Sequence, residues 1–142
     1  MTFSGARILA LDFGARRIGL AISDPLGLTA QGLPTLERSN RERDLAALLA
    51  LAREREVTLW LMGLPLHLSG TEGAQAQKVR NFGALLAARS GLPVEYWDER
   101  LTTVTAQRVL REAELSLAKR RQAVDRLAAV VLLQSYIEAH RA

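Results

Sequence analysis

Residues 7–24, RILALDFGARRIGLAISD, restrict the possible folds of this chain more than any other segment. Residues 8–11 form a continuous apolar run, which is typical of a strand that is covered on both faces. Asp12 ends this run, a turn containing Gly14 follows, and residues 17–23 predict a second strand that returns as a hairpin. A buried carboxylate is costly unless it is paired or holds a cation. The segment therefore predicts a hairpin with an ionisable group at the end of a buried strand.

Three further stretches have the pattern of strands. Residues 29–36 are interrupted by Pro34, and proline cannot donate a ladder hydrogen bond, so this strand is expected at an edge of the sheet. Residues 57–62 are a short apolar run that is bounded by Gly63, and residues 94–97 predict the last strand.

Helical spacing of apolar residues predicts four helices. Two capping boxes, Ser39 with Glu42 and Ser69 with Glu72, mark the starts of the first two helices. A basic connector, residues 119–121, precedes the last helix. The four helices are expected over residues 41–55, from the second capping box to about residue 89, from Thr102 or Thr103 to about residue 112, and over residues 122–140.

The order of these elements predicts the fold class. Three consecutive strands joined by tight turns favour an antiparallel meander, whereas the later strand–helix–strand units require right-handed parallel crossovers. We therefore expect an α/β protein with a mixed five-stranded sheet, helices on both of its faces, and a single domain over residues 1–142. In such sheets the functional groups gather at the carboxyl ends of the parallel strands.

Composition excludes some classes of site and favours one class of partner. The 142 residues include no cysteine, which excludes disulfides and thiolate metal sites. Neither a signal pattern nor an apolar run of about 20 residues is present, so a cytoplasmic protein without membrane association is expected. The net charge is +4, and Lys78 and Lys119 are the only lysines. Arginine binds phosphate bidentately, so nucleic acid is a natural partner, with an arginine-rich solvated surface as the alternative.

Acidic residues from distant parts of the chain suggest a divalent metal site. Asp12 ends the first strand, Asp98 and Glu99 follow the last strand, and Asp125 lies near the start of the final, largely apolar helix. Carboxylates that lie close together repel one another unless a cation intervenes, and hard oxygen ligands select Mg²⁺ or Mn²⁺. Such ions can promote hydrolysis of a phosphodiester.

Each acidic residue also has a structural alternative. Asp12 can cap the turn at Gly14. Asp125 can interact with the dipole of its helix near the N-terminus. Asp98, Glu99 and Arg100 can form a surface ion-pair cluster. Spacing alone does not decide between these roles and a metal site.

Four separated segments together resemble one protein family: LALDFGARRIGLAISD, GLPLHLSGTEG, YWDERLTT and VDRLAAVVLLQSYIE. They are similar to the YqgF family, also called RuvX, of the ribonuclease-H-like superfamily. The resemblance implies an RNase-H-like fold and a metal-dependent nuclease whose metal-binding and catalytic acids are Asp12, Glu99 and Asp125. It also selects Glu99 over Asp98, a choice that strand alternation leaves open. The family usually has a glycine-containing loop before Asp125, and this chain has no glycine after Gly91.

Several cations lie near these acids in the sequence and are candidates for phosphate contacts, with exposed or ion-paired surface positions as the alternative. His67 is a candidate proton shuttle, although a loop histidine is usually just exposed. Gly63 and Gly70 are expected to permit turns rather than to bind a ligand. The candidate nucleic-acid-binding residues are Arg16, Arg17, Arg100, Lys119, Arg120 and Arg121.

The leading hypothesis is a Mg²⁺- or Mn²⁺-dependent endonuclease that acts on structured nucleic acid. Its substrate is either Holliday-junction DNA or the 5′ end of pre-16S rRNA, and a junction substrate requires a two-fold homodimer. The alternatives are a non-catalytic nucleic-acid or ribosome-assembly factor and a phosphate-binding ATPase-like module. Because one domain cannot close around a nucleotide as paired domains do, no nucleotide cofactor is expected.

Overall fold

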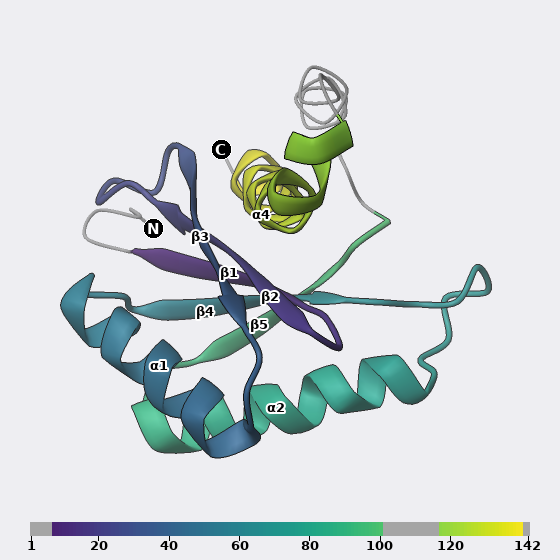
Figure 1. Cartoon of the computed structure of the whole chain (residues 1–142), viewed down its shortest axis with the longest axis horizontal. Coiled ribbons are helices and arrows are strands. Elements are labelled where there is room, and N and C mark those ends of the chain that lie inside the picture. The colour runs from purple at the N-terminus through teal and green to yellow at the C-terminus, as the bar shows by residue number, and fades with distance from the viewer. Residues whose placement is uncertain (1–6, 101–116, 141–142) are drawn as a thin grey trace.

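A mixed five-stranded sheet forms the centre of the protein in the computed structural model, which describes residues 7–100 and 117–140 (Figure 1). The strands are ordered β3-β2-β1-β4-β5. β2 is antiparallel to β1 and β3, whereas β4 is parallel to β1 and β5. The predicted meander, the parallel strands and the edge position of the third strand are therefore confirmed. The strands are β1 (Ile8–Phe13), β2 (Arg17–Ser23), β3 (Ala30–Glu37), β4 (Leu59–Leu64) and β5 (Val94–Asp98).

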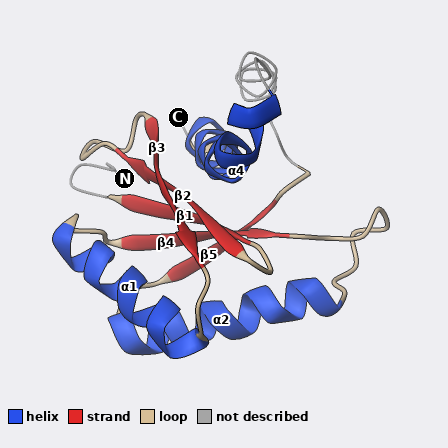
Figure 2. Ribbon diagram, in the orientation of Figure 1, coloured by secondary structure: helices blue, strands red, loops and turns tan. Residues whose placement is uncertain are grey.

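Helices cover both faces of the sheet, as predicted. Helices α1 (Arg41–Glu54) and α2 (Ala74–Ser90) lie below the sheet in Figure 2, and α4 (Leu117–Ala139) lies above it. The described part of the chain contains no helix that is long and apolar enough to cross a membrane.

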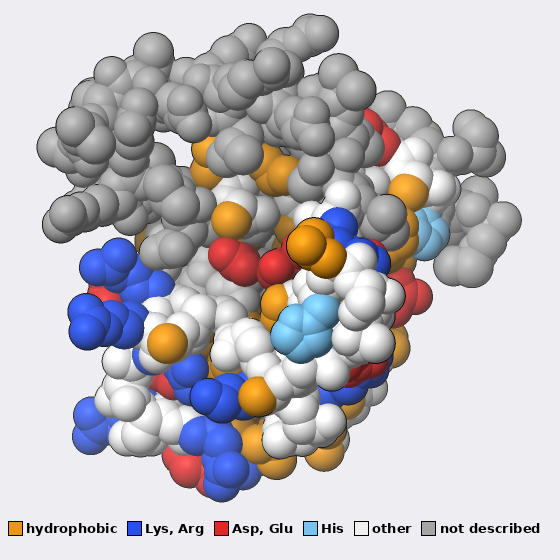
Figure 3. Space-filling view, turned by 90° about the vertical axis from the view of Figure 1, so that its right-hand side faces the viewer, with side chains coloured by type: hydrophobic (Ala, Val, Ile, Leu, Met, Phe, Trp, Pro, Cys, Tyr) orange, Lys and Arg blue, Asp and Glu red, His pale blue; other side chains and the backbone are white. Residues whose placement is uncertain are grey.

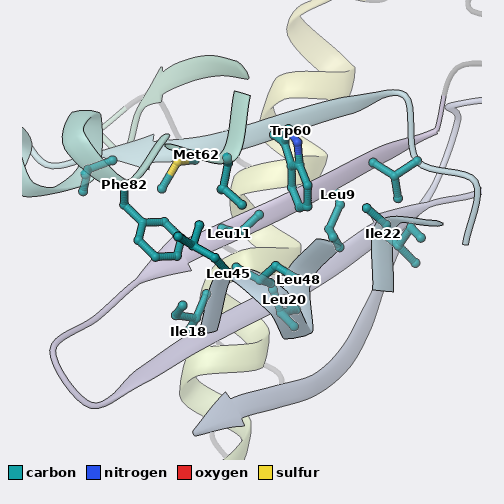
Figure 4. Close-up of a cluster of buried hydrophobic side chains, with 14 of the residues drawn as sticks. Leu9, Leu11, Ile18, Leu20, Ile22, Leu45, Leu48, Trp60, Met62 and Phe82 are labelled. Carbon is teal, nitrogen blue, oxygen red and sulfur yellow. The ribbon is translucent and has the colours of Figure 1, made fainter. Parts of the chain in front are cut away.

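Alternation along the strands divides the core into two layers. Leu9 and Leu11 on β1 pack with Leu45 of α1 and Phe82 of α2 in the cluster shown in Figure 4. Ile8, on the opposite face of β1, belongs to a second cluster that is completed by apolar residues of α4. One face of β1 therefore packs against α1 and α2, and the other packs against α4. Because side chains alternate along a strand, the face on which each later residue of β1 lies follows from its position.

The two predicted capping boxes are wrong. The cap of α1 is Asn40, whose side chain accepts a hydrogen bond from the backbone N–H of Arg43, rather than Ser39. Helix α2 begins only at Ala74, after Gly73, and no side chain caps it. Its predicted box fails because other partners hold both residues: Ser69 bonds Thr71, and Glu72 pairs with Arg80. Gly91 ends α2 with a φ of 74°, as the predicted helix stop requires.

Helix α4 begins at Leu117, so the predicted connector at residues 119–121 is helical instead. The physical reason is that no glycine or proline after Pro93 opposes helix formation there. Asp125 consequently lies deeper in the helix than its first turn. The short helix expected from Thr102 or Thr103 to about residue 112 falls outside the described residues.

Candidate metal site and nucleic-acid interface

The ends of β1, β4 and β5 meet at one edge of the sheet. Leu11 pairs with Met62, and Leu64 pairs with Asp98, so the three parallel strands finish side by side. Figure 3 looks onto this side of the molecule and shows acidic side chains together near its middle. This is the edge where the predicted site residues Asp12 and Glu99 lie.

Asp12 lies on the face of the sheet that α4 covers. It pairs with Gly19 across the β1–β2 hairpin, and it follows Ile8 and Ala10 at intervals of two residues. Both of those residues pack in the cluster with α4, so strand alternation places the Asp12 side chain on the same face. It is half-buried there.

Glu99 reaches the same face from β5. Glu95 accepts a hydrogen bond from the Tyr136 hydroxyl, and the Trp97 indole N–H donates to Ser135 at 3.2 Å, so both side chains meet α4. Glu99 continues this alternation, and its backbone N–H donates to the Leu64 carbonyl at 3.4 Å. The sequence alone did not show whether Asp98 or Glu99 points to the face that α4 covers. The contacts of Glu95 and Trp97 with α4 favour Glu99 on that face.

Gly63 provides the space into which Glu99 fits. A Cβ atom at position 63 would lie 2.5 Å from Oε1 of Glu99 and 3.0 Å from its Cγ, so any side chain here would displace the carboxylate. Sequence reasoning missed this role because it treated Gly63 as the end of a strand, whereas β4 continues through it. A glycine directly after an apolar run can also signal a close approach within a strand.

The carboxyl groups of Glu99 and Asp12 are in hydrogen-bonding contact. Partial burial raises the pKa of Glu99, and the charges of Asp12 and Asp98 raise it further, to about 7. Part of Glu99 nevertheless remains exposed to solvent at the edge of the sheet. Two carboxylates held this close repel each other when both are ionised, and a proton or a cation relieves that repulsion.

Asp98 has a different partner. Arg100 binds it through its backbone N–H at 2.9 Å and through its guanidinium at 2.8 Å. These hydrogen bonds lower the pKa of Asp98 and keep it ionised. The same guanidinium donates to the carbonyls of His67 and Leu68 at 3.3 Å, so Arg100 also anchors the loop between β4 and α2.

The remaining predicted site residues are divided between the hairpin, the loop and α4. Arg16 is exposed in the β1–β2 turn, and Arg17 pairs with Glu37 at 3.1 Å. His67 is exposed in its loop, where its Nε2 lies against Gly73. The last four residues belong to α4, and their side chains fall outside the described set: Lys119, Arg120, Arg121 and Asp125.

The part of the chain whose side chains are described contains no group of three metal-ligating side chains. Asp12 and Glu99 provide two carboxylates there, and the side chain of Asp125 lies outside that part. The described geometry therefore brings together two of the three predicted metal-binding acids and leaves the third as a prediction.

Comparisons with known proteins agree with the sequence resemblance. The family model described as "RuvX: Holliday junction resolvase" matches residues 6–139. A relative from Koribacter versatilis, named "Putative pre-16S rRNA nuclease", is 57% identical over 132 residues, which cover 93% of this chain and 86% of the relative. A Myxococcus xanthus relative with the same name is 50% identical over 135 residues, which cover 95% and 89% of the two chains.

Solved structures share the fold at low sequence identity. RuvC of T. thermophilus, in complex with a Holliday junction substrate, is similar with a TM-score of 0.60 at 16% identity, over 96% of this chain and 98% of that one. The fowlpox virus resolvase, in a complex with Holliday junction DNA, gives a TM-score of 0.55 at 13% identity, over 94% and 97% of the two chains. These likenesses confirm the predicted RNase-H-like fold. The family model and the two sequence relatives show that the chain belongs to the RuvX family.

Proposed function

We propose that this protein is a Mg²⁺- or Mn²⁺-dependent endonuclease that hydrolyses phosphodiester bonds in structured nucleic acid. The observation that carries this proposal is the contact between Asp12 and Glu99, from two parallel strands, over the space that Gly63 leaves. A fold would not be expected to hold two carboxyl groups together without a function for the pair. Membership of the RuvX family supports the same activity.

The donor set at this edge fits a hard divalent cation. Carboxylate oxygens are the ligands that Mg²⁺ and Mn²⁺ prefer. The pKa of Glu99 is raised by its burial first and by the neighbouring Asp12 second, and a bound cation would offset both effects. Asp125 is the third proposed ligand. It lies in α4 four residues, or about one helical turn, before Ala129, which is buried against the sheet.

The protein's own residues position the substrate and the charge. Asp12 lies on β1 and Glu99 directly follows β5, so the sheet fixes the backbone positions from which the two side chains approach each other. A bound divalent ion supplies charge that stabilises ionised carboxylates, activates water and stabilises the leaving oxygen of a phosphodiester. Six cations, three at this edge and three in the first turns of α4, are the proposed contacts to the substrate backbone: Arg16, Arg17, Arg100, Lys119, Arg120 and Arg121.

We propose the 5′ end of pre-16S rRNA as the substrate, because the relatives that are about half identical to this chain carry that name. Holliday-junction DNA is the second candidate, favoured by the description of the family model. Paired cuts at a junction require two active sites related by a two-fold axis, so this second candidate predicts a homodimer.

Cleavage by the purified protein tests the proposal. An rRNA precursor, a four-way junction and a plain duplex are incubated side by side with Mn²⁺ and with chelator. We expect cleavage of the precursor near the 5′ end of 16S rRNA with Mn²⁺ and none with chelator. Asp12→Asn should abolish cleavage and retain binding. Asp24→Asn is a matched control, because Asp24 only caps the turn before β3.

Three results would redirect the proposal. If a dimer cleaved the junction and left the precursor intact, Holliday-junction DNA would replace pre-16S rRNA as the proposed substrate. Precursor binding without cleavage under any metal condition would favour the non-catalytic assembly factor. Tight binding of ATP by the isolated protein, without cleavage of any substrate, would favour the ATPase-like module.

A further inference from the structure

An open pocket of about 340 Å³ lies between α1, α2 and the end of β1, on the opposite face of the sheet from Asp12. We call it the α1–α2 pocket. Its lining combines three cations, Arg38, Arg41 and Lys78, with an apolar side. Phe13, which follows Asp12 in the chain, forms part of that side, so the pocket lies directly behind the β1–β2 turn.

Two of the three cations have no ion-pair partner among the described residues. Arg38 is paired with Asp44, which is only 2% exposed and accepts a hydrogen bond from Nε of Arg38 at 3.3 Å. Arg41 and Lys78 are exposed, and the ion pairs within the described part of the chain do not include them. The acid next to Arg41, Glu42, is held by two hydrogen bonds from Arg89.

The positive charge of the pocket is therefore only partly compensated. Figure 3 shows Lys and Arg side chains gathered over the lower left part of the molecular face that also carries the acidic centre. Arg41 starts α1 and Lys78 lies in α2, so two rigid elements hold these two cations on either side of one concavity. Arg41 interacts electrostatically with the neighbouring Glu42 but forms no ion pair among the described residues. Such an arrangement favours an anionic group, and a phosphate above all.

The other side of the pocket suits a flat apolar group. The rings of Phe13 and Phe82 lie 4.7 Å apart, and Phe82 is almost fully buried beneath the pocket. The half-buried side chains of Phe13 and Leu85 therefore provide the apolar surface that a ligand can reach. The Arg38 guanidinium lies 4.4 Å from the centre of the Phe13 ring, so a cation already covers part of the apolar side. Nucleobases stack on aromatic side chains and on arginine planes. Asn81 also lines the pocket. Its Oδ1 accepts a hydrogen bond from Gln77 at 2.9 Å, and its amide NH₂ group can donate to a ligand.

We propose that the α1–α2 pocket binds one nucleotide, with its phosphate between Arg41 and Lys78 and its base against Leu85 and the Arg38 guanidinium, beside the half-buried Phe13 ring. The volume is at the lower end of the range for small-molecule sites, which fits a single nucleotide better than a duplex. A nucleotide of a substrate strand and a free nucleotide share this chemistry. The pocket adjoins the hairpin that carries Asp12, and this position favours the strand.

The assignment to a substrate strand rests on the proposed function, but binding in the pocket does not depend on cleavage. The measurement is therefore made with Asp12→Asn protein, which should bind nucleic acid without cutting it. A fluorescent single-stranded RNA is titrated at several salt concentrations. The test variant adds Arg41→Ala and Lys78→Gln, and the control adds Arg43→Ala and Arg53→Ala, which remove the same charge from exposed positions outside the pocket.

We expect the test variant to bind the RNA about tenfold more weakly than the parent, a loss of roughly 1.4 kcal/mol. The slope of the logarithm of its affinity against the logarithm of the salt concentration should be shallower, by the amount that corresponds to the loss of about one to two phosphate contacts. The control should change much less in both respects. Equal losses in test and control would show that only net charge matters, which overturns the pocket assignment.

A second arm separates the two sources of the nucleotide and tests the role of the base. AMP, ribose 5-phosphate and inorganic phosphate are titrated against the same proteins by calorimetry. Loss of AMP binding in the test variant with unchanged RNA binding would assign the pocket to a free nucleotide. Ribose 5-phosphate should bind more weakly than AMP. Equal binding of the two, or no effect of the test variant on either ligand, would contradict the nucleotide site.

Discussion

Gly63 is the residue on which the geometry of the acidic pair most depends. Its missing side chain leaves the space that the Glu99 carboxylate occupies. Glu99 is a flexible side chain, so it can move away from a new Cβ atom while the strands stay in place. Position 63 therefore controls the separation of the two carboxylates more than the stability of the sheet.

Gly63→Ala should weaken divalent metal binding by about tenfold or more, a loss in the range seen when residues supporting metal ligands are changed. The fold should persist because the nearest atoms belong to the Glu99 side chain. Mn²⁺ titration by calorimetry measures the affinity, and circular dichroism checks the fold.

Gly91→Ala is the matched control for this substitution. Gly91 has a φ of 74° and open space around it, so alanine should cost about 1 kcal/mol of folding free energy through strain alone. Its Mn²⁺ affinity should equal that of the parent. An unchanged affinity in Gly63→Ala would show that the position of Glu99 is not critical for metal binding.

The pKa of Glu99 gives a second prediction. It is raised from an ordinary value of 4.5 to about 7 in the folded protein. Without metal, the folded state then binds this proton more tightly than the unfolded state does. Stability should therefore be lost as the pH rises from about 4.5 to about 7, and this loss should be complete above that range.

Glu99→Gln removes this titration. In the presence of chelator, its melting temperature should match that of the parent near pH 4 and exceed it above pH 7. Added Mg²⁺ should raise the melting temperature of the parent but not that of the variant. Parallel curves of melting temperature against pH for the two proteins would contradict the raised pKa.

At the residue scale, sequence reasoning found the two acids but not what holds them. Asp12 was conspicuous because a carboxylate ended an apolar run. The choice of Glu99 over Asp98 came from a family resemblance. Side chains alternate between the two faces of a strand, but the sequence does not show which of them face α4, and only the contacts of Glu95 and Trp97 with α4 do so. The role of Gly63 depends on a neighbour in space that no local pattern reveals.

At the scale of elements, helix starts were the least predictable feature. Ser39 and Glu42 match a capping box, yet Asn40 is the residue that caps α1. The backbone N–H of Ser39 instead donates to Asp44 at 3.0 Å, which draws this segment toward Arg38 and the start of the helix. The buried Asp44, in the first turn of α1, thus binds the backbone before the helix and helps to set the residue at which α1 begins. Helix propensity does not reveal this contact.

Asn40→Ala should lower the free energy of unfolding by about 1 kcal/mol, because it removes the acceptor for the Arg43 N–H. For a chain of this size, that corresponds to a fall of roughly 3 °C in melting temperature. Ser39→Ala should change stability by less than about 0.5 kcal/mol, because the bond to Asp44 comes from its backbone. A larger loss of stability in Ser39→Ala than in Asn40→Ala would show that Ser39, and not Asn40, caps the helix.

At the scale of the whole molecule, the order of elements was sufficient to predict the sheet. Tight turns between the first three strands permit little except a meander, and helices between parallel strands enforce crossovers of one hand. The meeting of β1, β4 and β5 at one edge follows from this topology. The α1–α2 pocket did not follow, because its cations come from separate elements that only packing brings together.

The central claim is that Asp12, Glu99 and Asp125 converge on a shared divalent ion. The most direct test is the location of Mn²⁺ in crystals of the protein by anomalous diffraction. We predict an ion at roughly 2 Å from carboxylate oxygens of all three residues. No ion at the ends of β1 and β5 at saturating Mn²⁺, or an Asp125 carboxylate too remote to reach it, would contradict the claim.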